Sequence, residues 1–139
     1  MKAAQEQLRK IADSAELEYV IDRDGDLAYR FGSSVVYVHL EQGEENFAWL
    51  RIFAIVALDL KYSVELLGAI NRLNMESRVG KFYLNRDKLF FEHYVSLDEL
   101  SAKSFSIYIH IVGNTANNLD ETLASSFEGR TFTDLGDVN

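Results

Sequence analysis

The sequence predicts a single α+β domain in which an antiparallel sheet packs with helices, in the order helix, three strands, helix, two strands, helix. Segments with apolar residues every three to four positions, typical of helices, are interspersed with segments of alternating apolar and polar residues, typical of strands. The connections between neighbouring strands are too short for parallel crossovers, so we expect antiparallel pairing. The 139 residues suit one domain. We expect it to occupy residues 1–128, and residues 129–139 to form a frayed polar tail.

Local patterns predict the first helix and the first two strands. Residues 3–15 carry apolar side chains on one side of a helix. An extended approach at residues 19–22 leads into Asp24-Gly25, a dipeptide that strongly favours a hairpin turn. The two strands and the tight turn between them are 27–31, Gly32-Ser33 and 34–41.

A third strand, residues 47–58, is expected at the centre of the sheet. Both of its faces are apolar apart from Arg51, and a strand of this kind is usually covered on two sides. Arg51 should either pair with a carboxylate or project at the edge of the sheet.

The second helix should begin after Ser63, whose hydroxyl can accept a hydrogen bond from a free backbone N–H of the first turn. Glu65 lies in that turn, where the helix dipole stabilises a negative charge. An apolar stripe continues the helix to about Ser77. The strands that follow, and the turn that joins them, are 81–85, Arg86-Asp87 and 89–95.

The last element fits two patterns. Alternating apolar residues in the segment 104–112 match a strand, whereas apolar residues at steps of three to five as far as Phe127 match a helix. The segment Ser96-Leu97-Asp98-Glu99 has the form of a capping box, in which serine and glutamate side chains satisfy backbone N–H groups at the start of a helix. We therefore predict a long helix from this point, with Gly113 as a candidate break.

Charge and composition exclude several classes of protein. The formal net charge is -8 and the sequence pI is about 4.8, so the surface repels the phosphates of nucleic acids and of anionic membranes. The chain has no cysteine, which excludes disulfides, thiolate nucleophiles and cysteine zinc sites. Neither a signal peptide nor a membrane-spanning stretch is recognisable. We expect a cytoplasmic protein with no nucleic-acid or membrane partner.

The sequence predicts no catalytic, cofactor or metal site, and hence no enzymatic activity. Residues 22–26 contain three aspartates, but the glycine and the final glutamate of a calcium-binding EF-hand loop are not where that loop requires them, so a turn is preferred. His39, His93 and His110 lack metal-site spacing, although the first two could meet as a pair on one sheet. The glycine spacing also excludes the nucleophile elbow, the P-loop and the dinucleotide-binding motif.

Two short stretches stand out as motifs. They are Asp22-Arg23-Asp24-Gly25-Asp26-Leu27 before the first strand, and Ala69-Ile70-Asn71-Arg72-Leu73-Asn74 leading into Gly80-Lys81-Phe82-Tyr83-Leu84. With the order of elements over residues 3–127, they resemble the YbjN family of small bacterial proteins and the type III secretion chaperone-like fold. The resemblance implies a non-enzymatic, cytoplasmic domain that binds a peptide or protein, often as a dimer. It brings no catalytic residue and no defined binding motif.

Aromatic residues are the most informative about binding. The alternation within the strands places four residues on the face opposite to the expected core. Two interpretations stay open: a helix also covers this face, or the face is an apolar patch that dimerises or receives a partner. The four residues are Val35, Tyr37, Phe90 and Tyr94.

The predicted function is that of a chaperone- or adaptor-like domain. It would bind another polypeptide, or itself as a homodimer, through this sheet face or through an exposed strand edge. The alternative is a regulatory module that senses a small apolar molecule in a concavity of the same sheet face, without a bound cofactor. An enzyme would need a cluster of histidine and carboxylate groups that only the folded chain could assemble.

Overall fold

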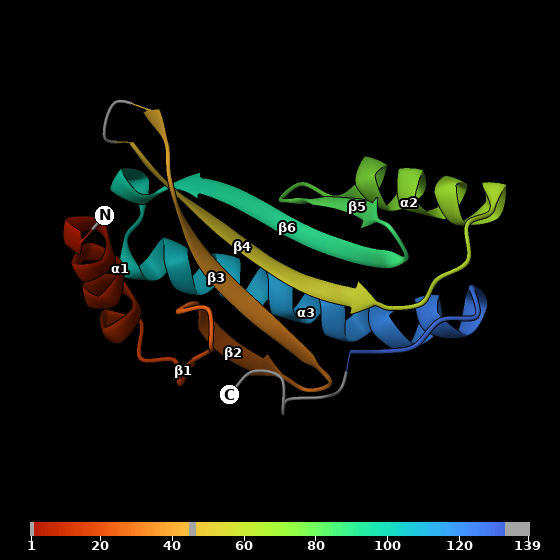
Figure 1. Cartoon of the computed structure of the whole chain (residues 1–139), viewed down its shortest axis with the longest axis horizontal. Helices are drawn as coiled ribbons and strands as arrows, with labels where there is room; N and C mark the ends of the chain where they lie inside the picture. Colours follow the sequence, from red (N-terminus) through yellow and green to blue (C-terminus); the bar gives the residue numbers. More distant parts are fainter. Residues whose placement is uncertain (1, 45–46, 133–139) are drawn as a thin grey trace.

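A computed structural model describes residues 2–44 and 47–132 of the chain. It confirms the α+β class and the antiparallel sheet, and Figure 1 shows the arrangement. The extended approach before the first hairpin is itself a short strand, so the sheet has six strands in the order β1-β2-β3-β4-β6-β5. The elements in chain order are α1 (Lys2–Ser14), β1 (Val20–Ile21), β2 (Leu27–Phe31), β3 (Ser34–Gln42), β4 (Ala48–Ala57), α2 (Val64–Glu76), β5 (Lys81–Asn85), β6 (Lys88–Ser96), the short 3-10 helix η2 (Leu97–Glu99) and α3 (Ala102–Ser126).

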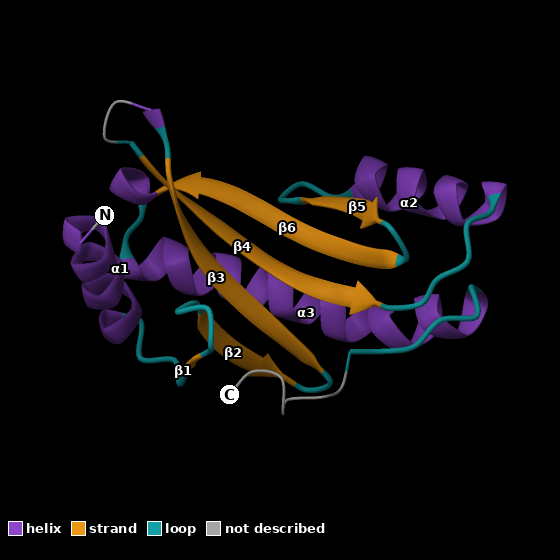
Figure 2. Ribbon diagram, in the orientation of Figure 1, coloured by secondary structure: helices purple, strands orange, loops and turns teal. Residues whose placement is uncertain are grey.

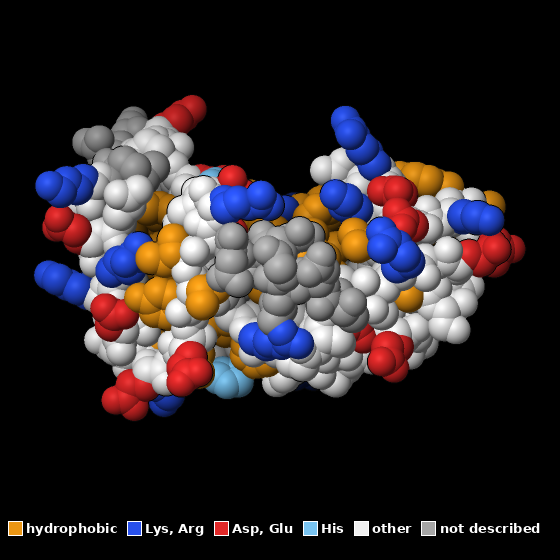
Figure 3. All heavy atoms as spheres, turned by 60° about the horizontal axis from the view of Figure 1, so that its bottom comes forward, with side chains coloured by type: hydrophobic (Ala, Val, Ile, Leu, Met, Phe, Trp, Pro, Cys, Tyr) orange, Lys and Arg blue, Asp and Glu red, His pale blue; other side chains and the backbone are white. Residues whose placement is uncertain are grey.

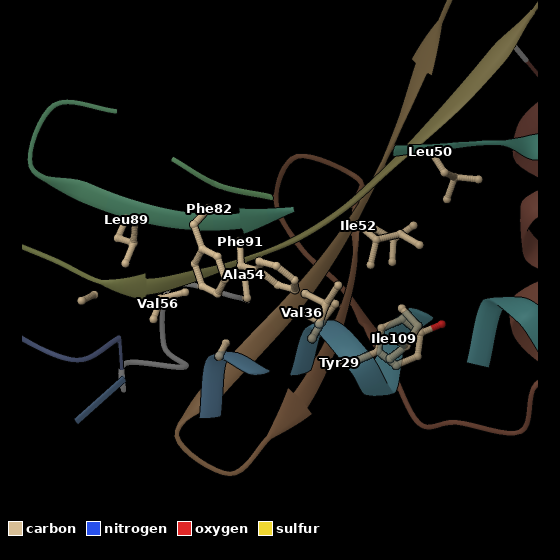
Figure 4. Close-up of a cluster of buried hydrophobic side chains, with 14 of the residues drawn as sticks. Tyr29, Val36, Leu50, Ile52, Ala54, Val56, Phe82, Leu89, Phe91 and Ile109 are labelled. Atoms are coloured by element: carbon tan, nitrogen blue, oxygen red, sulfur yellow. The ribbon is translucent and has the colours of Figure 1, made fainter. Parts of the chain in front are cut away.

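The helices and the sheet share one main core on one face of the sheet. Buried side chains of all three helices belong to the same apolar cluster as the inward side chains of the strands. In Figure 2, α3 lies behind the strands, and it contacts β2, β3, β4 and β6. Figure 4 shows the centre of this core, where strand side chains such as Val36 and Phe91 point toward Ile109 of α3. We call this side of the sheet the inner face and the opposite side the outer face.

The strand register fixes which residues reach each face. Opposite residues in an antiparallel pair point to the same side. Val36 lies opposite Ala54, and Ala54 opposite Phe91, so these three share the inner face. Their neighbours along each strand therefore point outward. The predicted alternation is confirmed, and β4 is central in the sheet as expected.

The second sequence motif closes one edge of the sheet. Ser63 caps α2 as predicted, with its hydroxyl accepting a hydrogen bond from the backbone N–H of Leu66. Near the other end of α2, the side-chain amide of Asn74 accepts from the N–H of Phe82 at 2.7 Å and donates to its C=O at 3.0 Å. Asn74 thus satisfies the backbone N–H and C=O of Phe82 on the edge strand β5, as a neighbouring strand would.

The last helix is confirmed as a helix, but its start is not where the sequence pattern put it. Ser96 still belongs to β6, opposite Trp49, and its side chain makes no capping bond. The segment after it forms only the 3-10 turn η2. The helix starts five residues later, where Ser101 and Ser104 make the reciprocal bonds of a capping box. Of the helices that the structure describes, none is long and apolar enough to cross a membrane.

Gly113 does not break α3, which runs without interruption from Ala102 to Ser126. This glycine is buried and faces the ring of Phe31 on β2. A Cβ at this position would lie within 2.7 Å of three atoms of that ring. The residue is therefore small because the helix and the β2–β3 hairpin approach closely, at the cost of some helix propensity.

The described part of the C-terminal tail is attached to the sheet. After α3 the chain turns back, and Arg130 forms an isolated antiparallel bridge with Leu58 at the end of β4. Both backbone hydrogen bonds of this bridge measure 2.7 Å. Phe132 then packs against Tyr37 on the outer face. The rest of the predicted frayed tail, residues 133–139, lies outside the described residues.

The two helical glycines give a matched test of this packing. Gly113→Ala should lower the free energy of unfolding by about 2 kcal/mol, because the new methyl group overlaps the Phe31 ring. Gly68→Ala in α2 should instead raise it by up to about 1 kcal/mol, since the nearest atom to its Cβ is 3.5 Å away and alanine favours the helix. Urea denaturation of both variants measures the difference, and equal effects would contradict the close approach.

Candidate functional site

The four residues predicted to share a face do share it. Val35 and Tyr37 on β3 and Phe90 and Tyr94 on β6 all point to the outer face. No helix residue belongs to the apolar cluster on this side, which consists of Ala28, Val35 and Tyr37 with Phe53 and Phe132 packed against them. The sequence left open whether a helix covers this face. Among the described residues, no helix does so.

A row of aromatic rings crosses four strands of the outer face. Tyr37 on β3 stacks on Phe53 of β4, with ring centroids 5.4 Å apart. Phe53 is 6.2 Å from Phe90 of β6, and Phe90 stacks on Tyr83 of β5 at 5.2 Å. Contacts of this geometry stabilise the pairs beyond their area of contact. The row forms a broad, nearly continuous apolar band perpendicular to the strands.

A charged cluster interrupts this apolar face. Arg51 donates to Glu92 at 2.7 Å and to the Tyr83 hydroxyl at 2.6 Å, and that hydroxyl in turn donates to Glu92 at 2.8 Å. The guanidinium also lies 3.8 Å from the centroid of the Phe53 ring, within cation–π range. Lys81 adds a second cation, 3.3 Å from the other oxygen of Glu92. Of the two alternatives expected for Arg51, pairing with a carboxylate is the one that the structure shows.

Glu92 is ionised because of these partners. Its burial alone would raise the pKa of the carboxyl, but the hydrogen bonds from Arg51 and Tyr83 and the nearby positive charges outweigh it, so the pKa lies below its usual value. Burial and the hydrogen bond to Glu92 raise the pKa of Tyr83, which stays protonated at neutral pH. The cluster is thus a satisfied ion pair, whose groups are engaged with one another.

The two ends of the outer face differ in exposure. Val35 and Tyr37 are only 3% and 9% exposed, at the end where Phe132 lies. At the other end Tyr94 is 38% exposed and donates to Glu41, and Trp49 is 40% exposed. The predicted site is therefore a partly covered band, with its open part over β4 and β6.

The histidine pair that the sequence allowed does not form. His39 points to the outer face, where its Nδ1 lies 2.7 Å from Asp26, whereas His93 points to the inner face and contacts the ring of Tyr108. His110 lies on α3 against Phe31. Asp22 accepts backbone N–H bonds within its own turn, as the hairpin interpretation expects. Within residues 2–44 and 47–132, no three His, Asp or Glu side chains are placed to hold a metal ion.

A groove lies beside α1, apart from the outer face. This open groove of about 750 Å³ runs between α1 and the β2–β3 hairpin, over apolar side chains that include Leu8 and Ile21. On the α1 side of Figure 3, hydrophobic side chains lie exposed between charged ones. The groove is distinct from the aromatic band, and it is the second surface that a partner segment could occupy.

Four residues of the outer face were missed in the sequence. Phe53 and Tyr83 complete the aromatic row, Glu92 neutralises Arg51, and Phe132 covers the end near Tyr37. For Tyr83 and Glu92, the alternation with Phe82 and Phe91 in the second hairpin was a usable signal. Phe132, alone in a polar segment, gave none.

Substitution of Glu92 tests the charged cluster. Glu92→Gln should lower the free energy of unfolding at neutral pH by about 2 kcal/mol, because Arg51 is then half-buried without a counter-charge. Since folding lowers the pKa of Glu92, its contribution is complete above about pH 4.5 and is lost as the pH falls below that value. The difference between wild type and variant should therefore shrink in urea titrations on acidification.

Glu128→Gln is the matched control, because Glu128 pairs with Lys61 where both side chains are exposed. It should change stability little at any pH. A Glu92 variant whose deficit is the same at acid and neutral pH would contradict the ion-pair account.

Comparison with known proteins agrees with the fold. The model of one protein family, described as T3SS (YopN, CesT) and YbjN peptide-binding chaperone 1, matches residues 4–135. Among solved structures, a chain of the ExsC–ExsE complex superposes with a TM-score of 0.61 at 18% identity, covering 88% of this chain and 93% of that one. A chain of the HopA1–SchA chaperone–effector complex gives 0.59 at 12% identity, covering 84% and 92%. No curated protein matches.

These similarities decide between the two functions that the sequence suggested. The family is one of peptide-binding chaperones, and its model covers nearly the whole domain. Nothing among the matches supports the alternative of a sensor for a small apolar molecule. The chain belongs to the family of type III secretion and YbjN peptide-binding chaperones.

Proposed function

We propose that this domain holds an extended segment of another polypeptide against the outer face of its sheet. The observation that carries the proposal is the aromatic row from Tyr37 to Tyr83, which none of the helices in residues 2–44 and 47–132 covers. A band of rings on a sheet offers apolar contact to alternate side chains of an extended chain. Large apolar surface on a sheet face is typical of a binding site for a partner.

The charged cluster supports a binding role without a catalytic step. A general acid or base must be free to exchange a proton with a substrate. Glu92 already accepts bonds from Arg51, Tyr83 and Lys81 and is held in its ionised form. These groups position one another and orient the rings beside them. We propose that the protein is not an enzyme and needs no cofactor.

Partner and location follow from charge and family. The net charge of -8 disfavours nucleic acid and anionic membrane, and favours basic or apolar segments. Because the family includes chaperones of type III secretion, a bacterial system, we propose that the protein acts in the bacterial cytoplasm.

We also propose that the domain forms a homodimer through α2. One side of this helix is apolar and exposed: Val64 is 83% exposed, Leu67 51% and Met75 77%. Their spacing of three and eight residues places them on one helix face. A second copy that brings the same face would cover both patches with closed two-fold symmetry.

Two substitutions on the open part of the outer face test client binding. Phe90→Asp combined with Tyr94→Ser should abolish capture of a polypeptide client from the cytoplasmic fraction of the source cells, because the first puts a charge into the aromatic row and the second removes an exposed ring. Mass spectrometry of the captured material compares wild type and variant. Both side chains are outside the main core, so circular dichroism should show an unchanged fold.

Two single variants locate the effect. Ile107→Asp, on the exposed side of α3, should leave capture unchanged. Ile21→Asp changes the groove beside α1. If Ile21→Asp loses the client while the double variant retains it, the client binds the groove and the outer face is not the site.

The homodimer is tested by Leu67→Asp with Met75→Asp. Two negative charges in the apolar patch of α2 should convert a dimer into a folded monomer, because a charge buried in an interface without a partner is costly. Sedimentation velocity measures the molar mass of both forms. A wild-type chain that stays monomeric at high micromolar concentration would contradict the proposal.

A further inference from the structure

The segment after α3 is built to return to the sheet. The helix ends at Ser126, and the N–H of Gly129 then bonds to the C=O of Ala124 at 2.8 Å. A Cβ on Gly129 would lie 2.5 Å from the backbone oxygen of Leu58, so only glycine allows the chain to pass this close to the end of β4. We call residues 128–132 the C-terminal strap.

The strap pairs with the sheet through one antiparallel bridge. Arg130 exchanges both backbone hydrogen bonds with Leu58, and its guanidinium pairs with Asp59. Two residues further on, Phe132 meets the Tyr37 ring, edge to face with centroids 6.3 Å apart.

These contacts lie on the surface that we assign to the client. Phe132 packs on the small cluster of Ala28, Val35 and Tyr37, at one end of the aromatic row. It contributes nothing to the main core that joins the helices to the sheet. Main-chain pairing combined with side-chain contacts is also how sheets bind foreign peptides.

We propose that the C-terminal strap is an internal occupant of the client-binding face, which a client segment displaces. The inference rests on the proposed function and deepens it by naming the kind of segment that fits. A client that replaces the strap carries a basic residue and, two positions later, an aromatic one. The basic residue pairs with Asp59, and the aromatic ring replaces Phe132 on Tyr37.

The strap is held weakly enough for exchange. Its ion pair is largely exposed on both sides, and exposed pairs contribute little to stability. Phe132 is only half-buried, and the bridge consists of one residue pair. Release of the strap therefore leaves the main core intact. An intramolecular occupant of this kind competes with the client. The apparent affinity for the client is the intrinsic affinity multiplied by the fraction of molecules in which the strap is released.

The chain's own C-terminal sequence is the probe for this site. A labelled peptide of residues 127–139 would be titrated into the full-length protein and followed by NMR, up to millimolar peptide because tethered segments act at about that effective concentration. Phe132→Ala in the protein removes the ring, and Arg130→Pro removes the N–H that bonds to Leu58. Each should bind the peptide about tenfold more tightly than wild type, as expected if the strap occupies the face about nine-tenths of the time.

Two controls make the result specific. Ile107→Ala, an exposed apolar truncation on α3, should bind the peptide as wild type does. A peptide in which alanine replaces the residue corresponding to Phe132 should lose binding to every form of the protein. Equal affinity of wild type, Phe132→Ala and Arg130→Pro would overturn the inference, as would absence of peptide binding to all three.

The same experiments separate this inference from the proposed function. If the Phe90 and Tyr94 variant loses its client while the strap variants bind peptide no better than wild type, the outer face binds clients but the strap does not regulate it. If the strap variants bind peptide more tightly while the Phe90 and Tyr94 variant keeps its client, the strap site exists but the client binds elsewhere.

Discussion

The whole arrangement depends on one constraint: the three helices bury their apolar sides in a single core on one face of the sheet. The long helix α3 contacts four of the six strands, and Gly113 allows it to lie close to Phe31 of the β2–β3 hairpin. Because the helices pack on the inner face, the outer face must be stabilised by its own side chains. A sheet with one face on the core usually turns polar residues to water on the other. Here much of that face is aromatic.

Polar and charged side chains of the outer face bind one another between the aromatic rings. Arg51 lies over Phe53 and binds Glu92 and Tyr83, so three strands are joined by one polar network between the rings. Such networks can specify register, because a shift of one residue would leave a charge unpaired. At the β5 edge, Asn74 occupies the backbone groups of Phe82 and prevents further strand pairing at that residue. Strand addition at this point of the β5 edge is thereby blocked.

The sequence was sufficient for the elements and for the phase of the strands, since alternation in β3 and β6 places Tyr37 and Phe90 on one face without knowledge of the fold. It failed where two local patterns compete. Ser96 and Glu99 match a capping box, yet Ser96 is still paired with Trp49 in the sheet, and tertiary pairing overrides the local signal. In β4 both faces are apolar, so Phe53 could not be recognised as an outward residue.

Long-range contacts explain the other errors. Whether His39 and His93 point to the same face depends on the register of β3 and β6, which are not paired with each other because β4 lies between them. No pattern within either strand contains that information. Phe132 is a single ring in a polar segment, and its position follows from the turn at Gly129 and the bridge to Leu58. Contacts of this kind become visible only when distant segments are brought together.

The separation of the two faces also determines how binding can be controlled. Because folding depends on the inner core, the outer face can change its occupant without loss of the domain. Exchange of the strap for a client replaces one strand bridge, one ion pair and one ring contact by equivalents, so the free-energy difference between the two states is small. A small difference is what makes the exchange sensitive to the sequence of the client, since a segment without the aromatic residue cannot compete with Phe132. In this arrangement the C-terminal strap makes the site selective, because a client must displace it. The aromatic row itself can accept many different apolar segments.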